Sequence, residues 1–81
     1  MSHPPVRWRD VERYFRARGY EIRAPKTGDK FIVAPRGTPG VTRLTCRIGH
    51  KCCSRPGDEV WDCYLAAIKR FFGVTWQDIL G

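Results

Sequence analysis

The spacing of hydrophobic residues predicts two helices at the two ends of a central region of strands. Apolar residues recur at three- and four-residue steps over Arg7–Arg18 and over Asp58–Phe72, the period of an α-helix with one buried face. Gly19 and Gly73 follow these segments, where glycine commonly ends a helix. Asp58 is expected to cap the second helix. Its stripe of apolar residues is the wider of the two, so this helix is expected to supply much of the core.

The region between the helices predicts three strands joined by short turns. Apolar and polar residues alternate in Tyr20–Pro25, Asp29–Pro35 and Val41–Ile48, which is the period of a strand with one wet face. Lys26–Asp29 reads as a hairpin turn, and Arg36–Gly40 contains two glycines and a proline. Sequential strands with short connections favour an antiparallel meander.

Alternation assigns the side chains of these strands to two faces. In the third strand Leu44, Cys46 and Ile48 are expected to face the core. The opposite, solvated face is expected to carry Arg23, Arg43 and Arg47, with Lys30 added if Phe31 and Val33 point inward. The sequence therefore predicts a basic outer face on the sheet.

The order of elements predicts one small α+β domain. Two helices can cover one face of a three-stranded antiparallel sheet, giving a two-layer α-β-β-β-α arrangement. The 81 residues suffice for a single domain over 1–81, with residues 1–6 expected to be flexible. A last short helical turn is expected over Thr75–Leu80, with Asp78 answering the Thr75 cap.

The charge of the chain is concentrated in its middle. Formal net charge is +7, from 15 Lys and Arg against 8 Asp and Glu, yet Lys30–Gly57 contains no acid. An uncompensated basic segment of this kind favours a polyanionic partner, and nucleic acid is the first candidate. The residues expected to bind it are Lys30, Arg43, Arg47, Lys51 and Arg55.

His50 is the candidate catalytic residue. An imidazole can take a proton from a ribose 2′-hydroxyl or give one to a leaving oxygen, because its pKa lies near neutrality. Neighbouring cations such as Lys51 could stabilise the charge that grows on the phosphate. The sequence shows no second acid–base partner, and a loop histidine that merely contacts solvent or a polyanion is the competing interpretation.

Four cysteines leave a zinc site as an alternative. Cys46, His50, Cys63 and one of Cys52 and Cys53 could supply four soft ligands, although their spacing is not that of the common zinc knuckles. Free thiols are expected, with Cys46 and Cys63 acting as small hydrophobic residues. The sequence predicts neither a metal nor any other cofactor.

The location expected from the sequence is the cytoplasm. No apolar run approaches the roughly 20 residues of a membrane span. The segment MSHPPVRWRD lacks the apolar stretch of a secretory signal. Cysteines in a reducing compartment stay free, which agrees with this expectation.

Four short motifs, in order, resemble HicA-type toxins of toxin–antitoxin pairs. They are ARGYEIR at the end of the first helix, KTGDKFIV in the hairpin, RGTPGVTRLT before the third strand and RPGDEV before the last helix. The resemblance covers roughly Arg7–Gly73 and implies a fold like that of double-stranded-RNA-binding domains. It also implies RNA cleavage as an mRNA interferase and an acidic antitoxin as partner.

The chain departs from this family at one position. The family's catalytic histidine follows the first hairpin turn, where this chain has Asp29 or Lys30. The resemblance therefore implies either a divergent RNA-binding protein without cleavage or a ribonuclease in which His50 is the replacement. The alternative function is a non-catalytic interaction protein whose basic surface grips an acidic protein.

Overall fold

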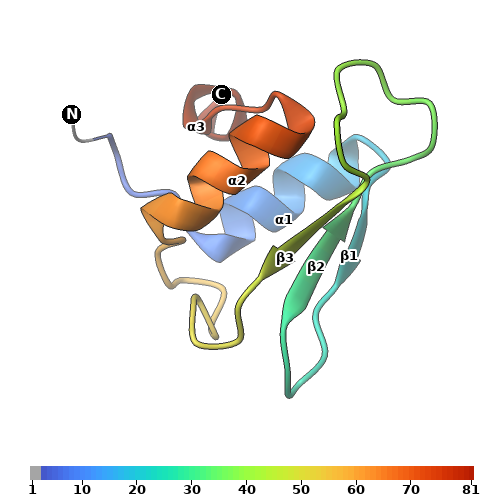
Figure 1. Cartoon of the computed structure of the whole chain (residues 1–81). Helices are drawn as coiled ribbons and strands as arrows, with labels where there is room; N and C mark the ends of the chain where they lie inside the picture. Colours follow the sequence, from blue (N-terminus) through green and yellow to red (C-terminus); the bar gives the residue numbers. More distant parts are fainter. Residues whose placement is uncertain (1–2) are drawn as a thin grey trace.

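The predicted α+β fold is confirmed by the arrangement of six elements. The computed structural model describes residues 3–81, in the order α1 (Trp8–Ala17), β1 (Glu21–Arg23), β2 (Lys30–Val33), β3 (Thr45–Ile48), α2 (Asp62–Phe72) and α3 (Trp76–Leu80). The strands form an antiparallel sheet in the order β1-β2-β3. Helices α1 and α2 lie on the same side of this sheet, and α3 packs beside α1 (Figure 1). Among residues 3–81, no helix has the length and apolar character needed to cross a bilayer.

The two faces of the sheet differ sharply in burial. Ile22, Ile32, Cys46 and Ile48 point toward the helices and are buried. The outer face carries exposed Glu21, Arg23, Thr45 and Arg47, with Phe31 and Val33 half-buried. Arg23 and Arg47 therefore lie on the solvated face, as the alternation predicts.

Lys30 belongs to the inner face. Fully buried Ile32 fixes the orientation of β2, because residues two apart in a strand share a face. Phe31 and Val33 consequently point outward, so the condition under which Lys30 would lie on the outer face is not met. Only 8% of Lys30 is exposed.

The third strand is shorter than the alternation predicts. β3 begins at Thr45. The Leu44 carbonyl still accepts from the Ala34 N–H at 2.7 Å, but the Thr42 N–H donates to the Phe71 carbonyl of α2 at 2.8 Å. Leu44, expected in the core, is 40% exposed. Arg43 lies in this segment, with its guanidinium 5.3 Å from the Phe71 ring centroid.

Helix α2 starts four residues later than its apolar pattern suggests. Residues 58–60 run in extended form beside residues 6–8: the Trp8 N–H donates to the Asp58 carbonyl at 2.9 Å, and the Val60 N–H donates to the Val6 carbonyl at 2.8 Å. The Asp58 carboxylate accepts from the Arg55 N–H at 3.0 Å and so closes a turn instead of capping α2. Trp61 becomes the N-cap, without a side-chain cap bond.

The core is formed between the sheet and both long helices. Phe15 of α1 contacts Tyr20 and Phe72, with ring centroids 4.7 and 5.5 Å away. Val6 is also fully buried, whereas residues 1 and 2 of the segment expected to be flexible lie outside the described residues. The cap predicted for the last turn is confirmed, since Thr75 and Asp78 form a reciprocal capping box at α3.

Candidate functional site

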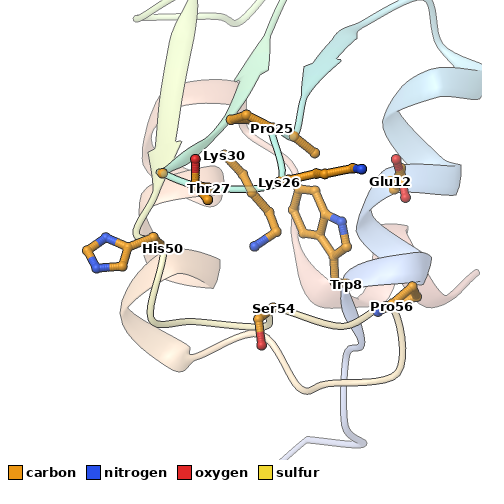
Figure 2. A pocket seen from close by; sticks show the side chains of 11 residues that line it. Trp8, Glu12, Pro25, Lys26, Thr27, Lys30, His50, Ser54 and Pro56 are labelled. Carbon is orange, nitrogen blue, oxygen red and sulfur yellow. The ribbon is translucent and has the colours of Figure 1, made fainter.

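A cavity of about 490 Å³ opens between α1, the β1–β2 turn and the loop 49–57 (Figure 2). This volume is within the range of small-ligand pockets. Its lining combines apolar walls with several titratable side chains. The lining residues are Trp8, Glu12, Ala24, Pro25, Lys26, Thr27, Gly28, Lys30, His50, Ser54 and Pro56.

The Lys30 ammonium group points into this cavity (Figure 2). Its Nζ donates to the Cys52 carbonyl at 3.3 Å and lies 5.5 Å from the Trp8 ring centroid. An ammonium has three donors, so this single bond leaves donor capacity for a ligand. The salt bridges formed within residues 3–81 do not include Lys30. A buried cation without a carboxylate partner is suited to receiving an anion from solution.

The other charges of the cavity leave it net positive. Lys26 extends across it toward Glu12, the one carboxylate of the lining (Figure 2). Glu12 is already bound to Arg16, at 2.8 Å between Oε2 and Nη2. The two lysines therefore outweigh the acid, and the cavity favours an anionic ligand.

A bonded cluster of three residues meets the cavity at His50, the one of the three that lines it. We call Asp29, Arg47 and His50 the rim residues. The Asp29 carboxylate accepts from Arg47 Nη1 at 2.8 Å and from the His50 N–H at 2.8 Å. His50 Nδ1 lies 3.1 Å from Asp29 Oδ1. The hydrogen bond from Arg47, followed by those from His50, lowers the pKa of Asp29 to about 2.

Asp29 determines which ring nitrogen of the neutral His50 imidazole carries the proton. An ionised Asp29 only accepts hydrogen bonds, so a bond from the imidazole requires the proton on Nδ1. In the neutral ring Nε2 is then the basic nitrogen. The His50 side chain is 62% exposed, and its ring is turned away from Lys30 and Trp8 toward solvent (Figure 2). Asp29 thus orients His50, a pairing that the sequence did not reveal, but as an ionised carboxylate it is not a second acid–base group.

The residues predicted to bind nucleic acid do not form one continuous wall. Lys30 lies in the cavity, Arg47 lies on the outer face and binds Asp29, and Lys51 and Arg55 are exposed in the adjoining loop. Arg43 precedes β3 at the opposite end of the sheet from the β1–β2 turn (Figure 1). The structure thus brings four of the five predicted residues to one end of the sheet.

The outer face of the sheet is less basic than the acid-free segment suggests. Arg23 binds Glu21 at 2.9 Å, and Arg47 binds Asp29 at 2.8 Å. Both acids precede the segment Lys30–Gly57 in the sequence, and the fold brings them against it. Within Lys30–Gly57, cations without a carboxylate partner include Lys30 in the cavity and Lys51 and Arg55 in the loop, together with Arg36 and Arg43 beyond the other end of the sheet.

The cysteines do not assemble the alternative zinc site. Among residues 3–81, no group of three or more His, Cys, Asp or Glu side chains is arranged to hold a metal ion. Cys46 is buried in the sheet, whereas Cys63 is exposed on α2. The Cys52 and Cys53 sulfurs lie 2.8 Å apart, and burial, followed by the bond to Cys52, raises the pKa of Cys53 to about 12. A thiol this hard to ionise is a poor metal ligand.

Comparison with known proteins leaves the function to be argued from this geometry. The chain matches no protein-family model, no curated protein and no solved structure. The resemblance to HicA-type toxins therefore continues to rest on the short sequence motifs.

Proposed function

We propose that this protein binds RNA, with a backbone phosphate held by Lys30 in the cavity and neighbouring phosphates held by the exposed cations of the loop. The observation that carries the proposal is the buried Lys30 ammonium, directed into an open cavity without a carboxylate partner. Lys51 and Arg55 extend the same positive charge outside the cavity. The short motifs that resemble HicA-type toxins support RNA as the polyanion.

The rim residues favour cleavage as a second activity of the same surface. His50 Nε2 takes the proton of a ribose 2′-hydroxyl, and the resulting oxygen attacks the adjacent phosphorus. The bond from phosphorus to the 5′-oxygen breaks, that oxygen takes a proton from water and leaves as a hydroxyl, and a 2′,3′-cyclic phosphate remains. Lys51 stabilises the charge on the phosphoryl oxygens, while Lys30 holds a neighbouring phosphate in the cavity. Asp29 holds the tautomer that this step requires.

Two variants of equal charge test the role of the cavity in binding. Lys30→Met keeps the length of the side chain and removes its charge, and Arg43→Met removes one charge at the far end of the sheet. Binding of a fluorescein-labelled single-stranded RNA is measured by anisotropy between 50 and 200 mM salt, where phosphate contacts weaken steeply. Lys30→Met is expected to lower affinity about tenfold and to reduce the salt slope by about one.

The control variant distinguishes a specific phosphate site in the cavity from general electrostatic attraction to the protein. Arg43→Met is expected to lower affinity less than threefold. Equal losses in the two variants would mean that RNA responds only to net charge, and the cavity would have no special role. If the wild-type protein does not bind RNA but binds a small acidic protein, the RNA-binding proposal is wrong. The basic surface would then be a protein-binding surface, as in the alternative of an interaction protein.

Cleavage is tested with all-ribose RNA and its all-deoxy counterpart. The ribose strand is expected to give 2′,3′-cyclic phosphate ends, and the deoxy strand none. His50→Gln is expected to slow the reaction at least ~100-fold, the usual contribution of a general base. Cleavage at the wild-type rate in His50→Gln would remove His50 from the mechanism while leaving the binding proposal intact.

A further inference from the structure

Trp61 and Tyr64 form an exposed aromatic pair at the start of α2. Their ring centroids are 5.9 Å apart with planes 24° from parallel, so the rings are stacked. Trp61 is 47% exposed, in contrast to Trp8, which is 3% exposed in the core. The apolar pattern of α2 predicts a buried Trp61, and the structure places much of its indole in solvent instead. An aromatic surface this open is available to a partner.

The aromatic pair adjoins the loop that carries the rim histidine. The Tyr64 hydroxyl lies so close to Gly49 that a Cβ atom on Gly49 would collide with it. His50 and Lys51 follow Gly49 directly and are exposed. Tyr64 therefore connects Trp61 to the loop of the proposed RNA site, in which Lys51 follows Gly49 by two residues, whereas the exposed carboxylates Glu59 and Asp62 flank Trp61 in the chain.

An exposed aromatic ring near a cation is suited to an unpaired base and its phosphate. Any base can stack on an indole through its π-face, while the cations hold the backbone. Bases inside a duplex are already stacked on one another, so they cannot stack on such a ring unless the base pair opens. A protein partner would also use an exposed Trp, but Lys51, in the loop that Tyr64 contacts, favours a phosphate-bearing one.

We propose that Trp61, supported by Tyr64, takes an unpaired base of RNA and makes the protein selective for single strands. This inference rests on the proposed function, because it places the base on the strand whose phosphates the cavity and loop hold. It assigns a role in specificity to a residue on α2, outside both the cavity and the rim.

The test compares single-stranded and duplex RNA on matched variants. Trp61→Ala and Trp61→Leu both remove the aromatic ring, and Trp61→Leu keeps an apolar side chain at the N-cap of α2. Leu44→Ala is the control, since Leu44 is also a large exposed apolar residue but lies before β3. The probes are a fluorescein-labelled ten-nucleotide oligoadenylate and a ten-base-pair RNA duplex, with folding of each variant checked by circular dichroism.

Loss of one stacked base is expected to weaken binding of the single strand roughly 5- to 150-fold in both Trp61 variants. Duplex binding and the Leu44→Ala variant are expected to change less than twofold. Unchanged single-strand affinity in the Trp61 variants, with Lys30→Met still defective, would overturn the inference and leave the proposed function standing. Equal losses on single strand and duplex, or a wild-type dimer that Trp61→Ala dissolves, would also overturn it. Failure of the wild-type protein to bind either RNA would overturn both.

Discussion

Substitution of Gly49 by alanine is expected to destabilise the protein through one contact. A Cβ atom there would lie 3.3 Å from Tyr64 Cζ and closer still to the Tyr64 hydroxyl oxygen. Gly49 is not among the glycines with positive φ, so its backbone tolerates alanine and the cost arises from the collision alone. Overpacking of this kind costs about 1–3 kcal/mol. Tyr64 is only half-buried and can partly move aside, which favours the lower half of that range.

A double-mutant cycle isolates this contact. Tyr64→Phe removes the hydroxyl, which is the nearest obstacle, and leaves the ring carbon at 3.3 Å. Gly49→Ala should therefore cost about 1 kcal/mol less in the Tyr64→Phe background, a coupling typical of residues in contact. Urea unfolding followed by fluorescence gives the free energies, provided that the m-values agree.

The matched control for this cycle is Gly57→Ala. A Cβ atom at Gly57 would meet nothing within 4 Å, and Gly57 also lacks a positive φ. Its replacement is expected to be neutral or to stabilise by up to about 1 kcal/mol, because alanine reduces the freedom of the unfolded chain. An equal cost of Gly49→Ala with and without the Tyr64 hydroxyl would refute the reasoning. That result would mean that the Tyr64 hydroxyl does not pack against Gly49 in the loop of His50.

Two further predictions concern Asp29 and Thr75. Because the folded pKa of Asp29 is lowered to about 2, the stability that Asp29 contributes is present above its unfolded pKa of about 4 and is lost as pH falls toward 2. Urea midpoints at stepped pH should therefore show the advantage of the wild type over Asp29→Asn shrinking between pH 4 and 2, and a constant difference would contradict the assignment. Thr75→Ala removes the side chain that accepts from the Asp78 N–H at 3.3 Å, and should lower the free energy of unfolding by about 1 kcal/mol. An unchanged melting temperature would show that the cap of α3 contributes nothing to stability.

The fold was largely predictable because local patterns agree with it. The helical period around Phe15 and the alternation around Ile32 each predict an element, because the residues of its buried face recur at regular short intervals in the sequence. The capping box of α3 is likewise a local signal, since Thr75 and Asp78 are three residues apart. Boundaries were less accurate, because hydrogen bonds from distant segments decided them. Residues 58–60 extend beside residues 6–8, although Asp58 and Glu59 resemble the start of a helix in the sequence.

The candidate site was predictable in part. His50 and the basic residues around it were identified from their types and their place in the chain. The partner of His50 was not, because Asp29 lies 21 residues away and only the register of the sheet brings them together. Pairing of Lys30 with Ile48 places the residue before β2 beside the residues after β3. The register of β2 against β3 would have revealed this pair, but the alternation of apolar and polar residues does not fix that register.

The sequence by itself determined the elements, their order and the excess of positive charge, because these depend on residue type and local period. Only the tertiary structure decided which charges remain without partners. Asp29 folds against Arg47, 18 residues away, whereas the pleat of β2 turns Lys30 inward to the cavity. The physical reason is that electrostatic energy depends on distance in space, and the pairing of strands sets that distance independently of separation along the chain.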